Sequence, residues 1–154
     1  MNDAILNRPV LLVEDNPVDL DLTLRAFARR NLINPVVVAR DGEEALAFLP
    51  RWRSGEPRPL VILLDLKLPR VHGLEVLQRF KADPVSQDIP VVILTSSAED
   101  RDVTDAYRFG ANSYIIKPVD FDKFLEVAGR IKLYWCITNQ PACLSQALPE
   151  GEST

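Results

Sequence analysis

Five short runs of apolar residues recur along the chain, and stretches with helical periodicity separate them. The runs occupy residues 9–15, 35–39, 60–64, 89–95 and 113–117. Each run is apolar almost throughout instead of alternating with polar residues, which is typical of strands in a parallel sheet that is covered on both faces. The pattern therefore predicts five buried strands.

Apolar residues at the spacing of an amphipathic helix follow the runs. Asn16-Pro17 and Asp41 are residue types that favour helix starts. The predicted helices cover residues 17–30, 41–49, 73–80, 103–110 and 121–135, the last of them extended. The segment "PRWRSGEPRP" at 50–59 is rich in proline and contains a glycine, so we expect a long loop there.

Strands that alternate with helices predict one doubly wound α/β domain with a parallel sheet. We place this domain at residues 8–137 and expect residues 138–154 to form an irregular tail. In such folds, ligands bind outside the carboxyl ends of the strands, where the strand order reverses. The residues that follow each apolar run are therefore the candidate functional residues.

Composition narrows the class of protein. The 154 residues carry a net charge of −4, with 47% hydrophobic and 26% charged residues, as expected for a globular domain with its own core. The sequence has no basic stripe, no apolar run of transmembrane length and no signal-peptide layout, so we expect no nucleic-acid partner and no membrane insertion. Cys136 and Cys143 do not form a CxxC motif, so neither a zinc site nor a disulfide framework is indicated, and we expect a cytoplasmic location.

Charged and hydroxyl-bearing residues stand where the predicted strands end. They are Glu14 and Asp15 after the first run, Asp65 after the third, Thr95 after the fourth and Lys117 after the fifth. Two like charges about 4 Å apart repel by roughly 4 kcal/mol at an effective dielectric near 20, so three clustered acids favour a bound cation. Hard oxygen donors without a thiol or an imidazole indicate Mg²⁺, with Mn²⁺ as a substitute.

The same residues fit phosphoryl transfer. A divalent cation and the positive charge of Lys117 together would allow the site to bind a dianion such as a phosphoryl group, and Thr95 supplies a hydrogen-bond donor. Asp65 is then the predicted nucleophile for the phosphoryl group. Pro118 favours an extended conformation for Lys117, which helps to aim the lysine side chain at this edge of the sheet.

Six short motifs together resemble the receiver domain of two-component response regulators. They are "VED" at 13–15, "LLD" at 63–65, "LP" at 68–69, Gly73, "LTS" at 94–96 and "KP" at 117–118. Their order and spacing carry the resemblance, which covers about residues 8–137. It implies a flavodoxin-like fold with strand order 2-1-3-4-5.

The resemblance also implies a role for each site residue. Asp65 would accept the phosphoryl group, Asp15 would bind the metal directly, Glu14 would act as a second acid, often through water, and the Lys67 carbonyl would complete the metal shell. Lys117 would pair with the phosphoryl group.

Thr95 would donate to the phosphoryl group as one half of a switch, and Tyr114 would be the other half. On phosphorylation, Thr95 is expected to swing toward the phosphoryl group and Tyr114 to turn inward. Such a change is a population shift in a two-state element.

Part of the chain has a narrower resemblance, to stand-alone receivers paired with bacterial phytochrome-type histidine kinases. The loop at 50–59, the "VEDNPVD" start and the ending "IKLYWCITNQPA" carry it. It implies a histidine kinase partner, a signalling role instead of an enzyme's, and no attached effector domain. Tyr134 and Trp135 lie on the extended last helix, where an apolar patch would favour a homodimer.

Other interpretations stay open. A small hydrolase of the haloacid dehalogenase type needs an aspartate two positions after its nucleophile, where this chain has Lys67. A nucleotide-binding module needs a glycine-rich phosphate loop, and neither GxGxxG nor GxxxxGK[ST] occurs in the sequence. The intact acid set disfavours a pseudo-receiver that signals without phosphorylation. His72, the one histidine, is expected to be exposed and inert.

Overall fold

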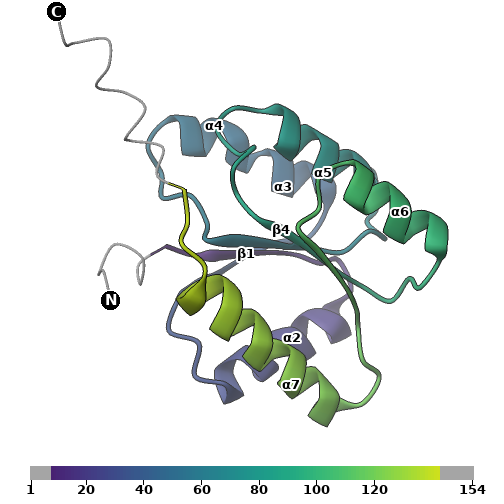
Figure 1. The fold of residues 1–154 in the computed structure, drawn as a ribbon. Helices are drawn as coiled ribbons and strands as arrows, with labels where there is room; N and C mark the ends of the chain where they lie inside the picture. Colours follow the sequence, from purple (N-terminus) through teal and green to yellow (C-terminus); the bar gives the residue numbers. More distant parts are fainter. Residues whose placement is uncertain (1–7, 143–154) are drawn as a thin grey trace, which may run out of the picture.

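A five-stranded parallel sheet forms the centre of the protein (Figure 1). The computed structural model describes residues 8–142. The strands are β1 (Val10–Val13), β2 (Val36–Ala39), β3 (Val61–Leu64), β4 (Val91–Thr95) and β5 (Ser113–Ile116). They lie in the order β2-β1-β3-β4-β5, so the expected fold class and strand order are confirmed.

Helices cover both faces of the sheet (Figure 1). One face carries α2 (Pro17–Arg29) and α7 (Phe121–Ile131). The other carries α3 (Gly42–Leu46), α4 (Phe48–Arg53), α5 (Gly73–Ala82) and α6 (Asp100–Arg108). Among the described residues, no helix combines the length and apolar character needed to cross a membrane.

The side chains of each central strand alternate between the two cores. In β3, Val61 and Leu63 pack with the α2 and α7 side, whereas Ile62 and Leu64 pack with the side of α3 to α6. A residue in a strand points to the face opposite from its neighbour, so a run that is apolar throughout buries both faces. This is the physical reason why the continuous apolar pattern identified the sheet.

The prediction of a loop over residues 50–59 was wrong in its first part. The chain forms two short helices, α3 and α4, and Pro50 lies in the first turn of α4. A proline is tolerated there because the first amide groups of a helix have no partner within the helix. Trp52 is buried, and its ring lies 5.7 Å from the rings of both Phe48 and Phe80.

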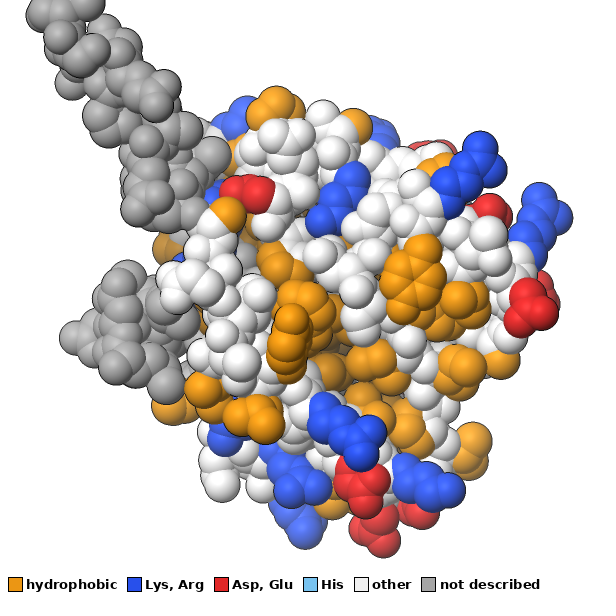
Figure 2. Space-filling view, viewed as in Figure 1, with side chains coloured by type: hydrophobic (Ala, Val, Ile, Leu, Met, Phe, Trp, Pro, Cys, Tyr) orange, Lys and Arg blue, Asp and Glu red, His pale blue; other side chains and the backbone are white. Residues whose placement is uncertain are grey.

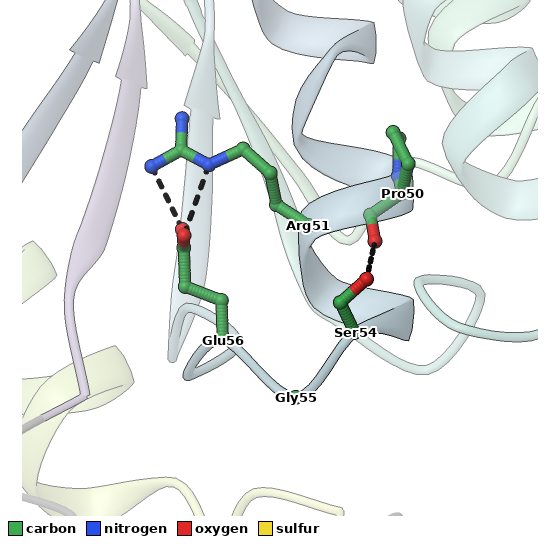
Figure 3. A pocket seen from close by; sticks show the side chains of 5 residues that line it. All are labelled: Pro50, Arg51, Ser54, Gly55 and Glu56. Atoms are coloured by element: carbon green, nitrogen blue, oxygen red, sulfur yellow. Dashed lines mark hydrogen bonds and ion pairs between the residues drawn. The ribbon is translucent and has the colours of Figure 1, made fainter.

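The C-terminal end of α4 borders a surface hollow lined by Pro50, Arg51, Ser54, Gly55 and Glu56. Figure 3 shows that the polar groups in this hollow bind one another. Arg51 forms an ion pair with Glu56 at 2.9 Å, and the Ser54 hydroxyl donates to the Pro50 carbonyl at 3.0 Å. The polar groups that line the hollow thus stabilise the turn that follows α4, instead of pointing toward a ligand.

The extended last helix is present, but it is not one regular α-helix. The α-helical part, α7, ends at Ile131, and a π-helical segment, η1, continues through Lys132–Thr138. The apolar spacing predicts that the helix continues past residue 131, but it does not predict the change from i→i+4 to i→i+5 hydrogen bonds. The expected tail at 138–154 lies largely outside the described residues, since the structure describes nothing beyond residue 142.

Gly73 is required by its close approach to the strand that precedes it. A Cβ atom at this position would lie 2.4 Å from the Asp65 carbonyl oxygen and 2.5 Å from the Leu66 Cα. Both atoms belong to the backbone, so they cannot move aside without shifting the end of β3. We expect Gly73→Ala to lower the free energy of unfolding by about 1–3 kcal/mol in urea denaturation, because it overpacks a tight contact.

Gly129→Ala is the matched control for Gly73→Ala. Gly129 lies inside α7, and the nearest atom to an added Cβ is the flexible Arg30 side chain at 3.3 Å. Alanine is favoured over glycine inside a helix by about 0.5–1 kcal/mol, so this variant should be neutral or more stable. Equal losses in the two variants would contradict the backbone contact at Gly73.

Candidate functional site

The backbone hydrogen bonds of the sheet continue one residue past the carboxyl ends of three strands and position the site residues there. The Glu14 amide donates to the Ala39 carbonyl at 3.0 Å, and the Asp65 amide donates to the Val13 carbonyl at 3.1 Å. The Lys117 amide donates to the Thr95 carbonyl at 2.8 Å. These bonds fix the residues just past the strand ends, so their side chains meet at one edge of the sheet.

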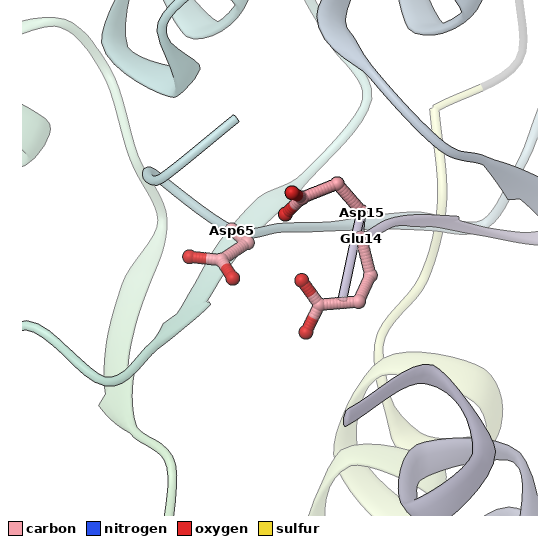
Figure 4. A group of neighbouring side chains, drawn as sticks. All are labelled: Glu14, Asp15 and Asp65. Carbon is pink, nitrogen blue, oxygen red and sulfur yellow. The ribbon is translucent and has the colours of Figure 1, made fainter. Parts of the chain in front are cut away.

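Glu14, Asp15 and Asp65 form an acid cluster at this edge (Figure 4). One carboxylate oxygen from each residue lies within 4.8 Å of the others. Glu14 and Asp65 are buried, and Asp15 is exposed. The Glu14 Oε2 atom is buried without a hydrogen-bond partner, which is costly for a polar atom unless something else binds it. The donors and this orphan oxygen fit a divalent cation such as Mg²⁺ or Mn²⁺.

The Lys117 ammonium group is the positive charge of the site. It pairs with Glu14, with Asp65 Oδ2 at 2.9 Å and with Asp19 Oδ2 at 3.0 Å. Its side chain is only 8% exposed. The predicted acids and lysine thus meet in one place, and Asp19 joins them. The sequence alone does not point to Asp19 as a site residue, because an acid in the first turn of a helix is already favoured by the helix dipole.

Thr95 and Tyr114 each use a side-chain hydroxyl group as a hydrogen-bond donor near the carboxyl ends of the strands. The Thr95 hydroxyl donates to Asp65 Oδ1 at 2.7 Å, and the Tyr114 hydroxyl donates to the Ser97 carbonyl at 2.8 Å. Ser97 is buried, and its hydroxyl donates to the Asp102 carboxylate at 2.5 Å. Thr95 therefore contacts Asp65 directly in this structure, while its movement toward a phosphoryl group stays a prediction.

The loop after Asp65 adds two contacts. The Lys67 amide donates to Asp65 Oδ1 at 3.2 Å, while the metal-binding role of the Lys67 carbonyl stays a prediction. His72 is exposed as expected, and it has a structural role, because its Nδ1 atom accepts from the Leu74 amide at 3.1 Å and caps α5. This loop thus ties Asp65 to the start of a helix.

Burial and mutual contact set the protonation of the site. Burial, reinforced by the nearby Asp65, raises the pKa of the Glu14 carboxyl from its ordinary 4.5 to about 8. Burial also acts to raise the pKa of Asp65, but hydrogen bonds with Glu14, Lys117 and Thr95 outweigh it and hold that pKa below its ordinary value. Without a cation, Glu14 therefore holds a proton more tightly than Asp65 does.

The raised pKa of Glu14 predicts a pH dependence of stability in chelator-treated protein. Between about pH 4.5 and 8 the folded state keeps a proton that the unfolded state has lost. Stability falls with pH wherever the folded state binds more protons, by at most about 1.4 kcal/mol per pH unit for one group. We expect urea denaturation to show this fall across pH 5–8 in the wild type and a flatter curve in Glu14→Gln. A wild-type curve that rises over this window would contradict the assignment.

A doubly wound α/β domain that gathers an acid cluster, a hydroxyl and a lysine at one edge of its sheet has the architecture of a receiver-type domain. The chain matches the response regulator receiver domain family over residues 10–128. It therefore belongs to the response regulator receiver family, whose members are signalling proteins.

Two relatives illustrate the range of this family. The chain is 43% identical over 128 residues to the probable methanogenesis regulatory protein FilR2 of Methanothrix harundinacea, with 82% of each chain covered. It is 36% identical over 131 residues to the response regulator Rcp1 of Synechocystis, with 84% of this chain and 89% of the relative covered.

Three solved structures of response regulators, two of them phytochrome response regulators by description, are similar to this chain over nearly their whole length. The phosphorylated cyanobacterial phytochrome response regulator RcpA is 35% identical with a TM-score of 0.82, covering 89% of this chain and 99% of that one. The Mn²⁺-bound form of Rcp1 is 33% identical with a TM-score of 0.79, covering 88% and 99%. The bacteriophytochrome response regulator AtBRR is 47% identical with a TM-score of 0.68, covering 87% and 99%.

Proposed function

We propose that the protein is a response regulator that accepts a phosphoryl group on Asp65 from a phosphohistidine of a histidine kinase. The observation that carries the proposal is the arrangement around Asp65. This buried carboxylate contacts a hydroxyl donor, Thr95, through one oxygen and the Lys117 ammonium through the other. Glu14 and Asp15 lie beside it, and among the described residues this cluster includes no thiol or imidazole.

In the proposed reaction, an oxygen of Asp65 attacks the phosphorus atom of the phosphohistidine. The new P–O bond forms as the P–N bond breaks, and the electron pair of that bond leaves with the imidazole nitrogen. Lys117 and Thr95 then donate hydrogen bonds to the phosphoryl oxygens, which spreads their negative charge. A divalent cation held by Glu14, Asp15, Asp65 and the Lys67 carbonyl would supply further neutralisation of that charge.

Two structures support the chemistry by similarity. Rcp1 has a Mn²⁺-bound form and RcpA has a phosphorylated form, and this chain is similar to both over nearly their whole length. The buried, unpartnered Glu14 oxygen is an independent reason from this chain alone to expect a cation at the site.

The proposed partner is a phytochrome-type histidine kinase, because the similar structures RcpA and AtBRR are phytochrome response regulators. The test is transfer from such a kinase, autophosphorylated with labelled ATP and then mixed with this protein. We expect the label to move to the wild type and not to Asp65→Asn. If the label stays on every phytochrome-type kinase tested, the proposed kinase partner is wrong. We also propose a cytoplasmic location for this protein.

We also propose that the region after α7 forms a homodimer contact. Leu133, Tyr134 and Ile137 are 59%, 53% and 47% exposed, and Figure 2 shows hydrophobic side chains gathered on the face over α6, β5 and α7. An exposed apolar patch of this kind favours association. In sedimentation, Leu133→Glu with Ile137→Glu should give a monomer where the wild type is a dimer. A wild type that is monomeric with and without phosphorylation would contradict the contact.

A further inference from the structure

The Lys117 ammonium group uses all of its hydrogen-bonding capacity within the site. An ammonium group has three N–H donors and no acceptor. Three carboxylates receive them, those of Glu14, Asp19 and Asp65. Any new acceptor that Lys117 is to bind must therefore displace one of these three.

Two of the three acids change their state in the proposed function. Asp65 becomes the acyl phosphate, so one of its oxygens is covalently modified and its charge is lost. Glu14 belongs to the acid cluster that would hold the cation. Asp19 lies outside that cluster and takes no covalent part. It is the acid that keeps both its charge and its freedom to bind Lys117 after phosphorylation.

We propose that Asp19 is a positioning residue that holds the Lys117 ammonium in place while one of its other donors passes from Asp65 to the phosphoryl oxygens. This inference rests on the proposed function of Asp65. Asp19 does not touch the transferred group, so it acts through Lys117 alone.

The surroundings of Asp19 suit this role. It lies in the first turn of α2, where the Asn16 side chain accepts from its amide at 3.1 Å and the Thr23 hydroxyl donates to its carbonyl at 2.7 Å. Its backbone is thereby fixed on a rigid element. Its side chain is 35% exposed, so it keeps its charge in contact with solvent while Lys117, on the inner side, remains buried.

The contact with Asp19 limits where the Lys117 ammonium group can lie. Lys117 reaches the site from the end of β5, and its long side chain has several rotatable bonds. When Asp65 and Glu14 take other partners, Asp19 keeps one fixed acceptor for the ammonium group. Small displacements of a charge-stabilising group cost large factors in rate, so loss of Asp19 should slow phosphorylation even though all the reacting atoms remain.

The test compares Asp19→Ala, Asp19→Glu and the control Asp21→Ala. Asp21 lies on the same helix, is exposed, and forms an ion pair with Arg25, one turn away, at 2.9 Å. The rate of phosphorylation is measured with acetyl phosphate at saturating Mg²⁺. We expect Asp19→Ala to slow it by about tenfold, Asp19→Glu to restore most of the rate, and Asp21→Ala to match the wild type.

A second readout follows Lys117 itself, through the nitrogen-15 NMR signal of its ammonium group under excess acetyl phosphate. We expect the signal to be protected from solvent exchange in the wild type and lost in Asp19→Ala. If the alanine variant does not fold, Asp19→Asn takes its place, with the same expected direction. A rate and a signal that match those of Asp21→Ala, or a faster rate, would overturn the role of Asp19 while leaving Asp65 as phosphoacceptor. A wild type that takes up no phosphoryl group would overturn both.

Discussion

Asp65→Asn is expected to abolish uptake of a phosphoryl group from acetyl phosphate in the presence of Mg²⁺. An amide oxygen carries no full negative charge and forms no stable acyl phosphate, so the nucleophile is removed. The side chain keeps its size, and its oxygen can still accept the Thr95 hydroxyl, now 2.7 Å from Asp65 Oδ1. Intact-protein mass spectrometry should show one added phosphoryl group in the wild type and none in the variant.

Asp88→Asn is the control for this experiment. Asp88 precedes β4, at the opposite end of the strand from Thr95, and its carboxylate pairs with Arg58 at 2.7 Å. This variant should be labelled like the wild type. Labelling of Asp65→Asn at the wild-type rate would show that another group accepts the phosphoryl group and would refute the assignment.

Lys117→Met is expected to have the second largest effect. It removes the ammonium group that pairs with Glu14, Asp19 and Asp65, while methionine keeps most of the apolar stem. Breaking a buried ion pair by removing one partner costs about 3–5 kcal/mol, so chelator-treated protein should unfold at much lower urea concentrations. Phosphorylation should slow by about a hundredfold, because a charge-stabilising donor is lost.

Divalent cations should partly rescue the stability of Lys117→Met, since a cation can neutralise the same carboxylates. Mn²⁺ binding, followed by calorimetry, should survive the substitution. Lys132→Met is the matched control, because Lys132 lies in η1 and donates to the Arg30 carbonyl at 2.8 Å, away from the acids. If Lys117→Met and Lys132→Met lose the same stability, Lys117 does not hold the acid cluster together.

The sheet and its acidic edge follow from the sequence because their signals are local. The central strands β1 and β3 are apolar on both faces, and the chain places a charged residue directly after β1, β3 and β5. In a parallel sheet these positions meet at one edge, so Glu14, Asp65 and Lys117 come together without any knowledge of side-chain geometry.

Two predictions of secondary structure from the sequence were wrong or incomplete, at Pro50 and in the final helix. Pro50 indicated a loop, yet it lies in the first turn of α4, where its missing amide is tolerated. The final helix changes from α to π geometry at Lys132, a change of hydrogen-bond partner that the spacing of apolar residues does not predict.

Asp19 and Ser97 were missed as site residues for a different reason. An acid in the first turn of a helix is favoured by the helix dipole, so Asp19 already had an adequate local explanation. Its contact with Lys117 joins residues 98 positions apart. The Ser97 carbonyl accepts from Tyr114 through its backbone, which no pattern of side chains reveals. Such contacts depend on tertiary packing and need coordinates.

The central claim is that Glu14, Asp15 and Asp65 together hold a divalent cation beside the phosphoacceptor. The most direct measurement is anomalous X-ray scattering from crystals of this protein soaked in Mn²⁺. The account predicts one strong peak within coordination distance of carboxylate oxygens of this cluster, and its absence in crystals of a Glu14→Gln, Asp15→Asn variant. Well-ordered crystals with no peak among these three side chains, or with a peak only elsewhere, would contradict it.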